Sequence, residues 1–96
     1  MYNYETLFIL KPELEEEAIQ ANISKFSEII SKGGGEVEKV DEWGKKKLAY
    51  PIDYHNEGYY VLTTFKSDGD LPRELERNFR ITEDVMRFLV KRTDRK

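Results

Sequence analysis

Three consecutive lysines, Lys45, Lys46 and Lys47, lie between Trp43 and Tyr50 in the sequence WGKKKLAYPI of residues 43–52. The segment is otherwise typical of a β-strand, and three adjacent charged side chains cannot all be buried in one. Ammonium groups neutralise phosphates and aromatic rings stack on bases, so nucleic-acid-binding surfaces use this pattern. The same pattern suits an edge strand that lysines protect against pairing with another chain. The segment alone leaves both interpretations open.

Length and composition limit the class of protein. The chain has 96 residues, 39% of them hydrophobic, which predicts one domain over residues 1–96 with a short basic end from about residue 92. There is no apolar run of the roughly 18 residues that a membrane span needs. The N-terminus lacks the features of a secretion signal, so we expect a cytoplasmic protein with no membrane partner. Without cysteine, and with His55 as the single histidine, the sequence predicts no metal site and no cofactor.

The net charge of −3 is unevenly distributed along the chain. Residues 1–42 hold four Lys and Arg against ten Asp and Glu, whereas residues 43–96 hold twelve against nine. Because salt confines electrostatic fields to about 8 to 10 Å, a local basic patch matters more for a polyanion than the total charge. A modest RNA-binding surface in the second part of the chain is therefore compatible with the composition, but a strongly basic, autonomous RNA binder is not.

The spacing of apolar residues predicts six secondary-structure elements. We expect strands over 2–10, 36–50, 59–66 and 85–92, a helix over 13–32, and a second helix that begins near Asp70. Gly44 is expected to mark a bend or a bulge in the second strand. Residues 53–58 are rich in turn formers, and they are expected to place His55 in a solvated turn.

The acidic start of the first predicted helix has a structural explanation. The helix dipole stabilises carboxylates in the first turn, and three glycines over residues 33–35 end the helix. The carboxylates concerned are Glu13, Glu15, Glu16 and Glu17. We therefore interpret them as a solvated helix start and not as a metal site.

The order of the elements is that of the ferredoxin-like, split β-α-β fold of α+β proteins. In this βαββαβ fold two helices cover one face of a four-stranded antiparallel sheet, and the other face stays open. If Thr6, Phe8 and Leu10 point towards the helices, their neighbours lie on the open face. Alternation in the third and fourth strands completes a contiguous apolar surface there, which predicts a protein-partner face. Its members are Leu7, Ile9, Tyr60, Leu62 and Leu89.

Four segments together resemble the family of bacterial ribosomal protein number six of the small (30S) subunit. They are Tyr4-Glu5, residues 43–52, Gly58-Tyr59-Tyr60, and Phe79-Arg80-Ile81 with VMRFLV at 85–90. The run of glycine, lysines and Leu-Ala-Tyr-Pro-Ile is the most specific, and the match covers essentially the whole chain. That family has the ferredoxin-like fold and binds the central domain of small-subunit (16S) ribosomal RNA together with small-subunit protein number eighteen. The resemblance implies the same for this chain, as a structural heterodimer partner without catalysis or a small-molecule substrate.

The resemblance also implies which residues contact RNA. They are Lys45, Lys46, Lys47 and Tyr50 in the motif, followed by Arg80, Arg87, Lys91 and Arg92. Each lysine is expected to attract phosphate without reading the base sequence. For Tyr50 two roles stay open, stacking on a base or packing in the strand before Pro51. The same two roles stay open for Trp43, of which we favour the structural one.

Proteins of other classes also use this fold. A hydrolase of acyl phosphates needs a phosphate-cradling loop, but residues 10–13 contain no glycine and precede further glutamates, so we do not expect an enzyme. A classical RNA-recognition module needs aromatics in a basic, glycine-containing context, which residues 59–64 lack. The remaining alternative is a regulatory module that buries its open face against a second copy and does not bind RNA.

Overall fold

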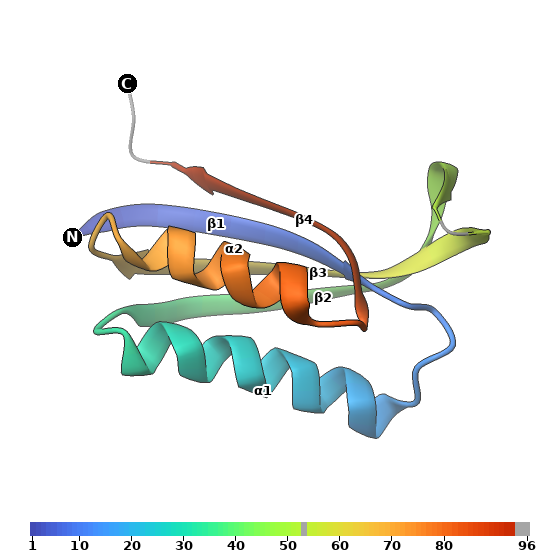
Figure 1. The fold of residues 1–96 in the computed structure, drawn as a ribbon, viewed down its shortest axis with the longest axis horizontal. Coiled ribbons are helices and arrows are strands. Elements are labelled where there is room, and N and C mark those ends of the chain that lie inside the picture. The colour runs from blue at the N-terminus through green and yellow to red at the C-terminus, as the bar shows by residue number, and fades with distance from the viewer. Residues whose placement is uncertain (53, 94–96) are drawn as a thin grey trace.

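The structure, a computed structural model, describes residues 1–52 and 54–93. The elements are β1 (Tyr2–Leu10), α1 (Glu16–Lys32), β2 (Glu36–Ile52), β3 (His55–Ser67), α2 (Leu71–Ile81) and β4 (Val85–Arg92). This βαββαβ order confirms the predicted one (Figure 1). The end of the predicted basic C-terminal segment, Arg95 and Lys96, lies outside the described residues.

The four strands form one antiparallel sheet in the order β2-β3-β1-β4. Both helices lie on the same side of this sheet (Figure 1), which confirms the ferredoxin-like class. β1 pairs with β3 from Tyr2↔Ser67 to Leu10↔Tyr59, and with β4 through Leu7↔Leu89. The strands β2 and β4 therefore form the two edges.

The core lies between the sheet and the two helices. Alternate residues of β1 and β3 are buried, as predicted from the period of two. The main cluster contains Tyr4, Phe8, Leu10, Ile19, Ile23, Phe26, Ile30, Val61, Phe65, Leu71, Leu75 and Phe79. Phe79 is at its centre, with ring centroids 5.1 Å from Phe8 and 4.5 Å from Phe26. These contacts hold the helices on one face and leave the other face uncovered.

The first helix begins later than predicted. It starts at Glu16, with Glu15 in an extended conformation at the N-cap, so only Glu16 and Glu17 lie in its first turn. Glu13 lies in the preceding turn, where its carboxylate contacts His55 Nε2 at 2.9 Å. The expectation of four glutamates in one helical turn was wrong, because Pro12 and the contact with His55 place Glu13 outside the helix.

The hairpin between β2 and β3 is longer than predicted. β3 begins at His55 and β2 continues through Pro51 to Ile52, with Ile52 opposite His55. The expected turn over residues 53–58 was therefore wrong for most of its length. Pro51 is tolerated because the register shifts between Lys47 and Ile52, where no regular ladder needs its missing N–H. We call residues 45–52 and 54–58 the hairpin arm.

Gly44 marks the base of this arm. Its φ is 81°, a value that glycine adopts at little cost, and the β2–β3 register shifts between Glu42 and Gly44. The bulge predicted at Gly44 is thus confirmed. Bulges bend a strand and increase its twist, so this position sets the direction in which the arm leaves the sheet.

Candidate partner and nucleic-acid interface

The open face of the sheet carries a group of apolar side chains from all four strands. Leu7 and Leu62 lie opposite each other on β1 and β3, and Leu89, opposite Leu7 on β4, is 57% exposed. On the β2 side, the rings of Trp43 and Tyr60 stack with centroids 6.2 Å apart and an interplanar angle of 14°. The partner-face residues predicted from alternation therefore lie on one surface, and Trp43 extends it.

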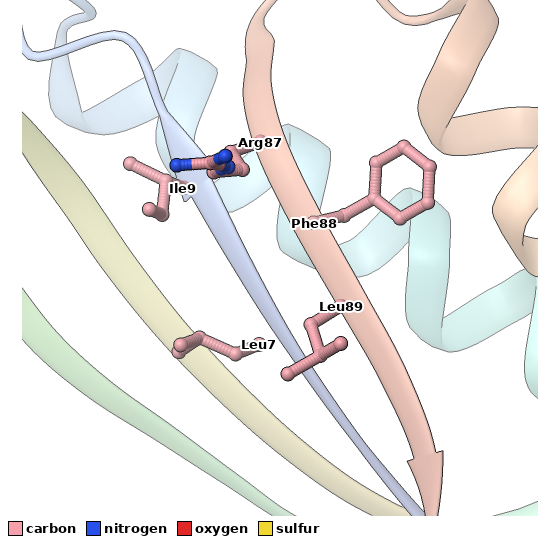
Figure 2. A pocket seen from close by; sticks show the side chains of 5 residues that line it. All are labelled: Leu7, Ile9, Arg87, Phe88 and Leu89. Carbon is pink, nitrogen blue, oxygen red and sulfur yellow. The ribbon is translucent and has the colours of Figure 1, made fainter. Parts of the chain in front are cut away.

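A hollow of about 280 Å³ lies between β1 and β4 on this face. Five residues line it, namely Leu7, Ile9, Arg87, Phe88 and Leu89. Figure 2 shows the side chains of Leu7 and Leu89 approaching each other and the guanidinium of Arg87 near Ile9, whereas the Phe88 ring points away towards the helices. Arg87 is the single charged residue among the five, so the hollow is apolar with one cationic wall.

A second hollow of about 180 Å³ continues the first across the sheet. It is lined by Glu5, Leu7, Trp43, Leu62, Leu89 and Lys91. The ion pair between Lys91 and Glu5, with Nζ and Oε1 3.2 Å apart, forms its polar side. Sequence reasoning placed Glu5 on this face but missed Trp43, because a bulge precedes Gly44 and shifts the alternation that would have assigned Trp43.

Ile9 is less accessible than its place on the open face predicts. It belongs to the open face but is only 6% exposed. A Cβ atom built on Gly58 would be 2.3 Å from Ile9 Cγ2, so the arm backbone lies directly against this side chain. Leu48, itself 8% exposed, is the neighbour of Gly58 on the other strand of the arm. The arm therefore covers most of Ile9 and leaves its remaining surface in the larger hollow.

The three lysines of the arm are all exposed, and they do not point the same way. Lys45 lies opposite Tyr59 and Lys47 opposite Glu57, while Lys46 lies opposite Gly58 on the open face. The Lys46 ammonium is 5.4 Å from the centroid of the Trp43 ring, a cation–π contact. The lysines thus flank both sides of the arm, which suits contact with phosphates on a ligand that surrounds it.

Tyr50 and Arg87, two predicted RNA contacts, meet across the sheet. Arg87 Nη1 donates a hydrogen bond of 2.6 Å to the Tyr50 hydroxyl, and the guanidinium lies 5.4 Å from the ring centroid. Tyr50 is 56% exposed and does not belong to the hydrophobic core. Its ring therefore remains accessible to a ligand, except on the side that Arg87 occupies.

The other predicted RNA contacts are spread over two faces. Lys91 lies on the open face beside Leu89. Arg80 belongs to α2 and its guanidinium is 5.7 Å from the Phe88 ring, which points to the helices. Arg92 lies four residues after Phe88 on the same face of β4, and its guanidinium is 3.8 Å from the centroid of the Tyr2 ring. The structure therefore brings Arg87 and Lys91 to the open face and places Arg80 and Arg92 on the helix side.

Two polar contacts lie at the arm and at its base. The first is the pair of His55 and Glu13, where a backbone hydrogen bond of Glu13 and then the charge and hydrogen bond of His55 lower the pKa of the Glu13 carboxyl. His55 is thus paired with Glu13 and half-buried, and not simply solvated as expected from its polar turn. In the second contact, Tyr59 donates a 2.7 Å hydrogen bond to Glu42, and this raises the pKa of Tyr59 to about 12.

Over residues 1–52 and 54–93, no group of three or more His, Cys, Asp and Glu side chains is arranged to hold a metal ion. In the same ranges no helix is long and apolar enough to cross a membrane. The fold and the exposed apolar surface define a ferredoxin-like α+β protein with an open, partly hollowed sheet face and a basic hairpin arm at its edge.

Comparison with known proteins identifies the family. The family model described as Ribosomal protein S6 matches residues 3–92. The small ribosomal subunit protein bS6 of Clostridium novyi (strain NT) is 66% identical over 90 residues, covering 94% of this chain and 95% of that protein. The protein of the same name from Caldanaerobacter subterraneus subsp. tengcongensis is 52% identical over 94 residues, covering 98% and 99%. The chain belongs to the ribosomal protein S6 family.

A solved structure agrees with this assignment. The crystal structure of 30S ribosomal protein S6 from Thermotoga maritima superposes with a TM-score of 0.91 at 33% identity, covering 96% of this chain and 87% of that one. The resemblance stated from the motifs is therefore confirmed. The chain is a structural, RNA-associated protein of the bacterial small ribosomal subunit in the cytoplasm, and not an enzyme.

Proposed function

We propose that this chain binds the central domain of 16S ribosomal RNA cooperatively with small-subunit protein number eighteen, with which it forms a heterodimer. One observation carries the proposal: an apolar open face and an exposed lysine arm lie next to each other on a chain whose net charge is only −3. A protein with so little basic surface needs a second component to reach high affinity for RNA.

The open face supports protein number eighteen as that component. Its central residues, Leu7, Leu62 and Leu89, remain partly or largely exposed in the isolated chain. Large exposed apolar patches on soluble proteins generally mark interaction sites. The polar rim of Glu5 and Lys91 around this centre matches the usual anatomy of an interface, in which a dry apolar centre is surrounded by charged groups.

The arm supports contact with RNA. Lys45, Lys46 and Lys47 are exposed on both sides of it, and Tyr50 presents an exposed ring beyond them. Ammonium groups attract phosphates regardless of base sequence, whereas an exposed ring can stack on a base with about 1 to 3 kcal/mol. The arm is thus suited to positioning the heterodimer on RNA more than to reading sequence.

The proposal is tested by measuring binding to a fragment of the 16S central domain with and without protein number eighteen, over a series of salt concentrations. We expect tight binding only with the partner. The variant Lys45→Ala/Lys46→Ala/Lys47→Ala should bind more weakly, and its salt slope should be smaller by about 0.7 to 0.9 for each phosphate that it no longer neutralises. A charge control is Lys25→Ala/Lys32→Ala on α1, which removes two lysine charges outside the arm.

A different result would favour the alternative. If the chain self-associates at micromolar concentration and binds neither the RNA fragment nor protein number eighteen, the open face serves a second copy, as in a dimerising module. Analytical ultracentrifugation of the chain alone distinguishes this case, because the proposed heterodimer requires a monomer that is available to its partner.

A further inference from the structure

We infer that the hollow between β1 and β4 receives one apolar side chain of the protein partner, and that Arg87 transmits the occupancy of this hollow to the hairpin arm. This inference rests on the proposed function, since it assigns a docking point and a means of coupling to the same open face. It gives Arg87 a positioning role: Arg87 would act on RNA binding through Tyr50, in addition to any contact of its own.

The size and lining of the hollow indicate a side chain as the occupant. Its volume of about 280 Å³ is at or below the lower end of small-molecule sites, which typically have about 300 to 1,000 Å³. Four of the five lining residues are apolar, so a polar metabolite would lose hydrogen bonds to water without replacement. An aliphatic side chain would occupy the part of the hollow between Leu7, Ile9 and Leu89, and its main-chain carbonyl could accept a hydrogen bond from Arg87.

Arg87 belongs to both the hollow and the arm contact. Its side chain lines the hollow, while Nη1 donates the 2.6 Å hydrogen bond to Tyr50. In the isolated chain both residues are exposed, so water competes for this bond. An occupant would cover the aliphatic part of the Arg87 side chain and displace water from the contact. The hydrogen bond between the guanidinium and the hydroxyl would then strengthen, because it lies in surroundings of lower polarity.

Ile9 provides a second link between the hollow and the arm. It lines the hollow, and its Cγ2 lies against the backbone of Gly58 in the arm. Two residues that line the hollow therefore touch the arm. Arg87 contacts Tyr50, and Ile9 contacts Gly58. An occupant that packs on both would hold the arm in one orientation. RNA would then bind lysines that are already positioned. The entropy cost of ordering the arm would fall on partner binding and no longer on RNA binding.

Hydrogen exchange of the arm amides, measured with and without protein number eighteen, tests this coupling. The informative variant is Tyr50→Phe, which keeps the ring and removes the hydroxyl that accepts from Arg87. The matched control is Tyr54→Phe, which removes the same atom from a fully exposed ring. We expect the partner to slow exchange at residues 47–50 and 56–58 about fivefold in the wild type and in the control, but less than twofold in Tyr50→Phe.

RNA affinity provides the functional measurement. The heterodimer that contains Tyr50→Phe should bind the central-domain fragment about fivefold more weakly than the wild-type heterodimer, at the lower end of usual allosteric couplings. Its affinity for protein number eighteen should stay within about twofold, since the hollow itself is unchanged. A purely structural role of Tyr50 would not separate these two affinities.

The outcomes distinguish the inference from the proposed function. If protein number eighteen binds the wild type but leaves exchange in the arm unchanged, or slows it equally in Tyr50→Phe, the coupling is overturned and the proposed heterodimer stands. If protein number eighteen does not bind the wild-type chain, the proposed function fails and the inference fails with it.

Discussion

Arg87 of β4 donates a hydrogen bond of 2.6 Å to the hydroxyl of Tyr50 of β2, although these two strands are the opposite edges of the sheet. The contact exists because the hairpin arm bends over the open face where the β2–β3 register shifts between Lys47 and Ile52. Two residues that family resemblance assigns separately to RNA therefore touch each other. The surface expected to face RNA and the surface expected to face a protein are continuous at this point.

The close approach of Gly58 to Ile9 makes a first stability prediction. An alanine Cβ at position 58 would lie 2.3 Å from Ile9 Cγ2, so Gly58→Ala must displace the arm or the side chain. We expect a decrease of about 1 to 3 kcal/mol in the free energy of unfolding, measured by urea denaturation. Gly69→Ala is the control, because its Cβ would make only an ordinary contact of 3.9 Å with Tyr2 and should change stability by less than about 0.5 kcal/mol.

A double variant shows whether Ile9 is the cause of that decrease. Ile9→Ala removes the Cγ2 atom that the new methyl group would meet. The destabilisation by Gly58→Ala/Ile9→Ala should therefore be smaller than the sum of the two single effects, by about 0.5 kcal/mol or more. Additive effects would show that Gly58→Ala acts elsewhere.

Phe79 is expected to be among the most sensitive core positions. Its ring is 1% exposed and contacts the rings of Phe8, Phe26 and Phe88. Phe79→Ala should lower the free energy of unfolding by about 3 to 5 kcal/mol, a large part of the stability of a small domain. Ile81→Ala, two residues further along α2 and 66% exposed, should have an effect below about 0.5 kcal/mol. Equal destabilisation by the two variants would contradict the burial of the Phe79 ring.

The hydrogen bond from Tyr59 to Glu42 predicts a dependence of stability on alkaline pH. The folded chain holds the Tyr59 proton up to a pKa of about 12, against an ordinary value of 10.0. The hydrogen bond therefore contributes fully below pH 10, and its contribution is lost as the pH rises towards 12. Tyr59→Phe should be less stable than the wild type by about 1 kcal/mol at pH 8, and the difference should shrink above pH 10. A difference that stays constant to pH 12 would count against this hydrogen bond.

The contact between Glu13 and His55 can be observed by carbon NMR of the Glu13 carboxyl. Its pKa is lowered from 4.5, first by a backbone hydrogen bond and then by the charge and hydrogen bond of His55. A lowered pKa means that the carboxylate stabilises the fold above pH 4.5 and that this effect is lost as the pH falls through the folded pKa. His55→Ala should raise the Glu13 pKa without restoring it completely, because the backbone bond remains. Asn56→Ala, a substitution at the next residue of the arm, should leave the Glu13 pKa unaltered.

The sequence predicted most of the fold because its local signals agree. The period of two in residues 2–10 and 59–66 and the apolar stripe of α1 indicated the correct order, layers and inward-facing residues. The start of α1 was misplaced since glutamate runs fit both a helix and the turn before it. The far part of the arm was missed because Asn56 and Gly58 favour turns, while pairing with Lys46, Lys47 and Ile52 extends β3 to His55.

The candidate site was less predictable than the fold. Alternation identified Leu7, Leu62 and Leu89 from the sequence alone, since each follows from the face of its own strand. The contact of Tyr50 with Arg87 and the cover over Ile9 depend on how far the arm bends, a long-range property that no local pattern encodes. The RNA contacts assigned by resemblance remain predictions for this chain.

Calorimetric titration of the chain with protein number eighteen tests the proposed heterodimer without any RNA present. Leu89→Gln places a polar group of similar size at the junction of the two hollows, and Ile81→Gln makes the same change on the exposed end of α2. We expect the wild type and Ile81→Gln to bind protein number eighteen with the same affinity, whereas Leu89→Gln should bind it at least about tenfold more weakly. Equal binding by all three proteins would contradict docking on the open face, and no binding by any of them would contradict the heterodimer itself.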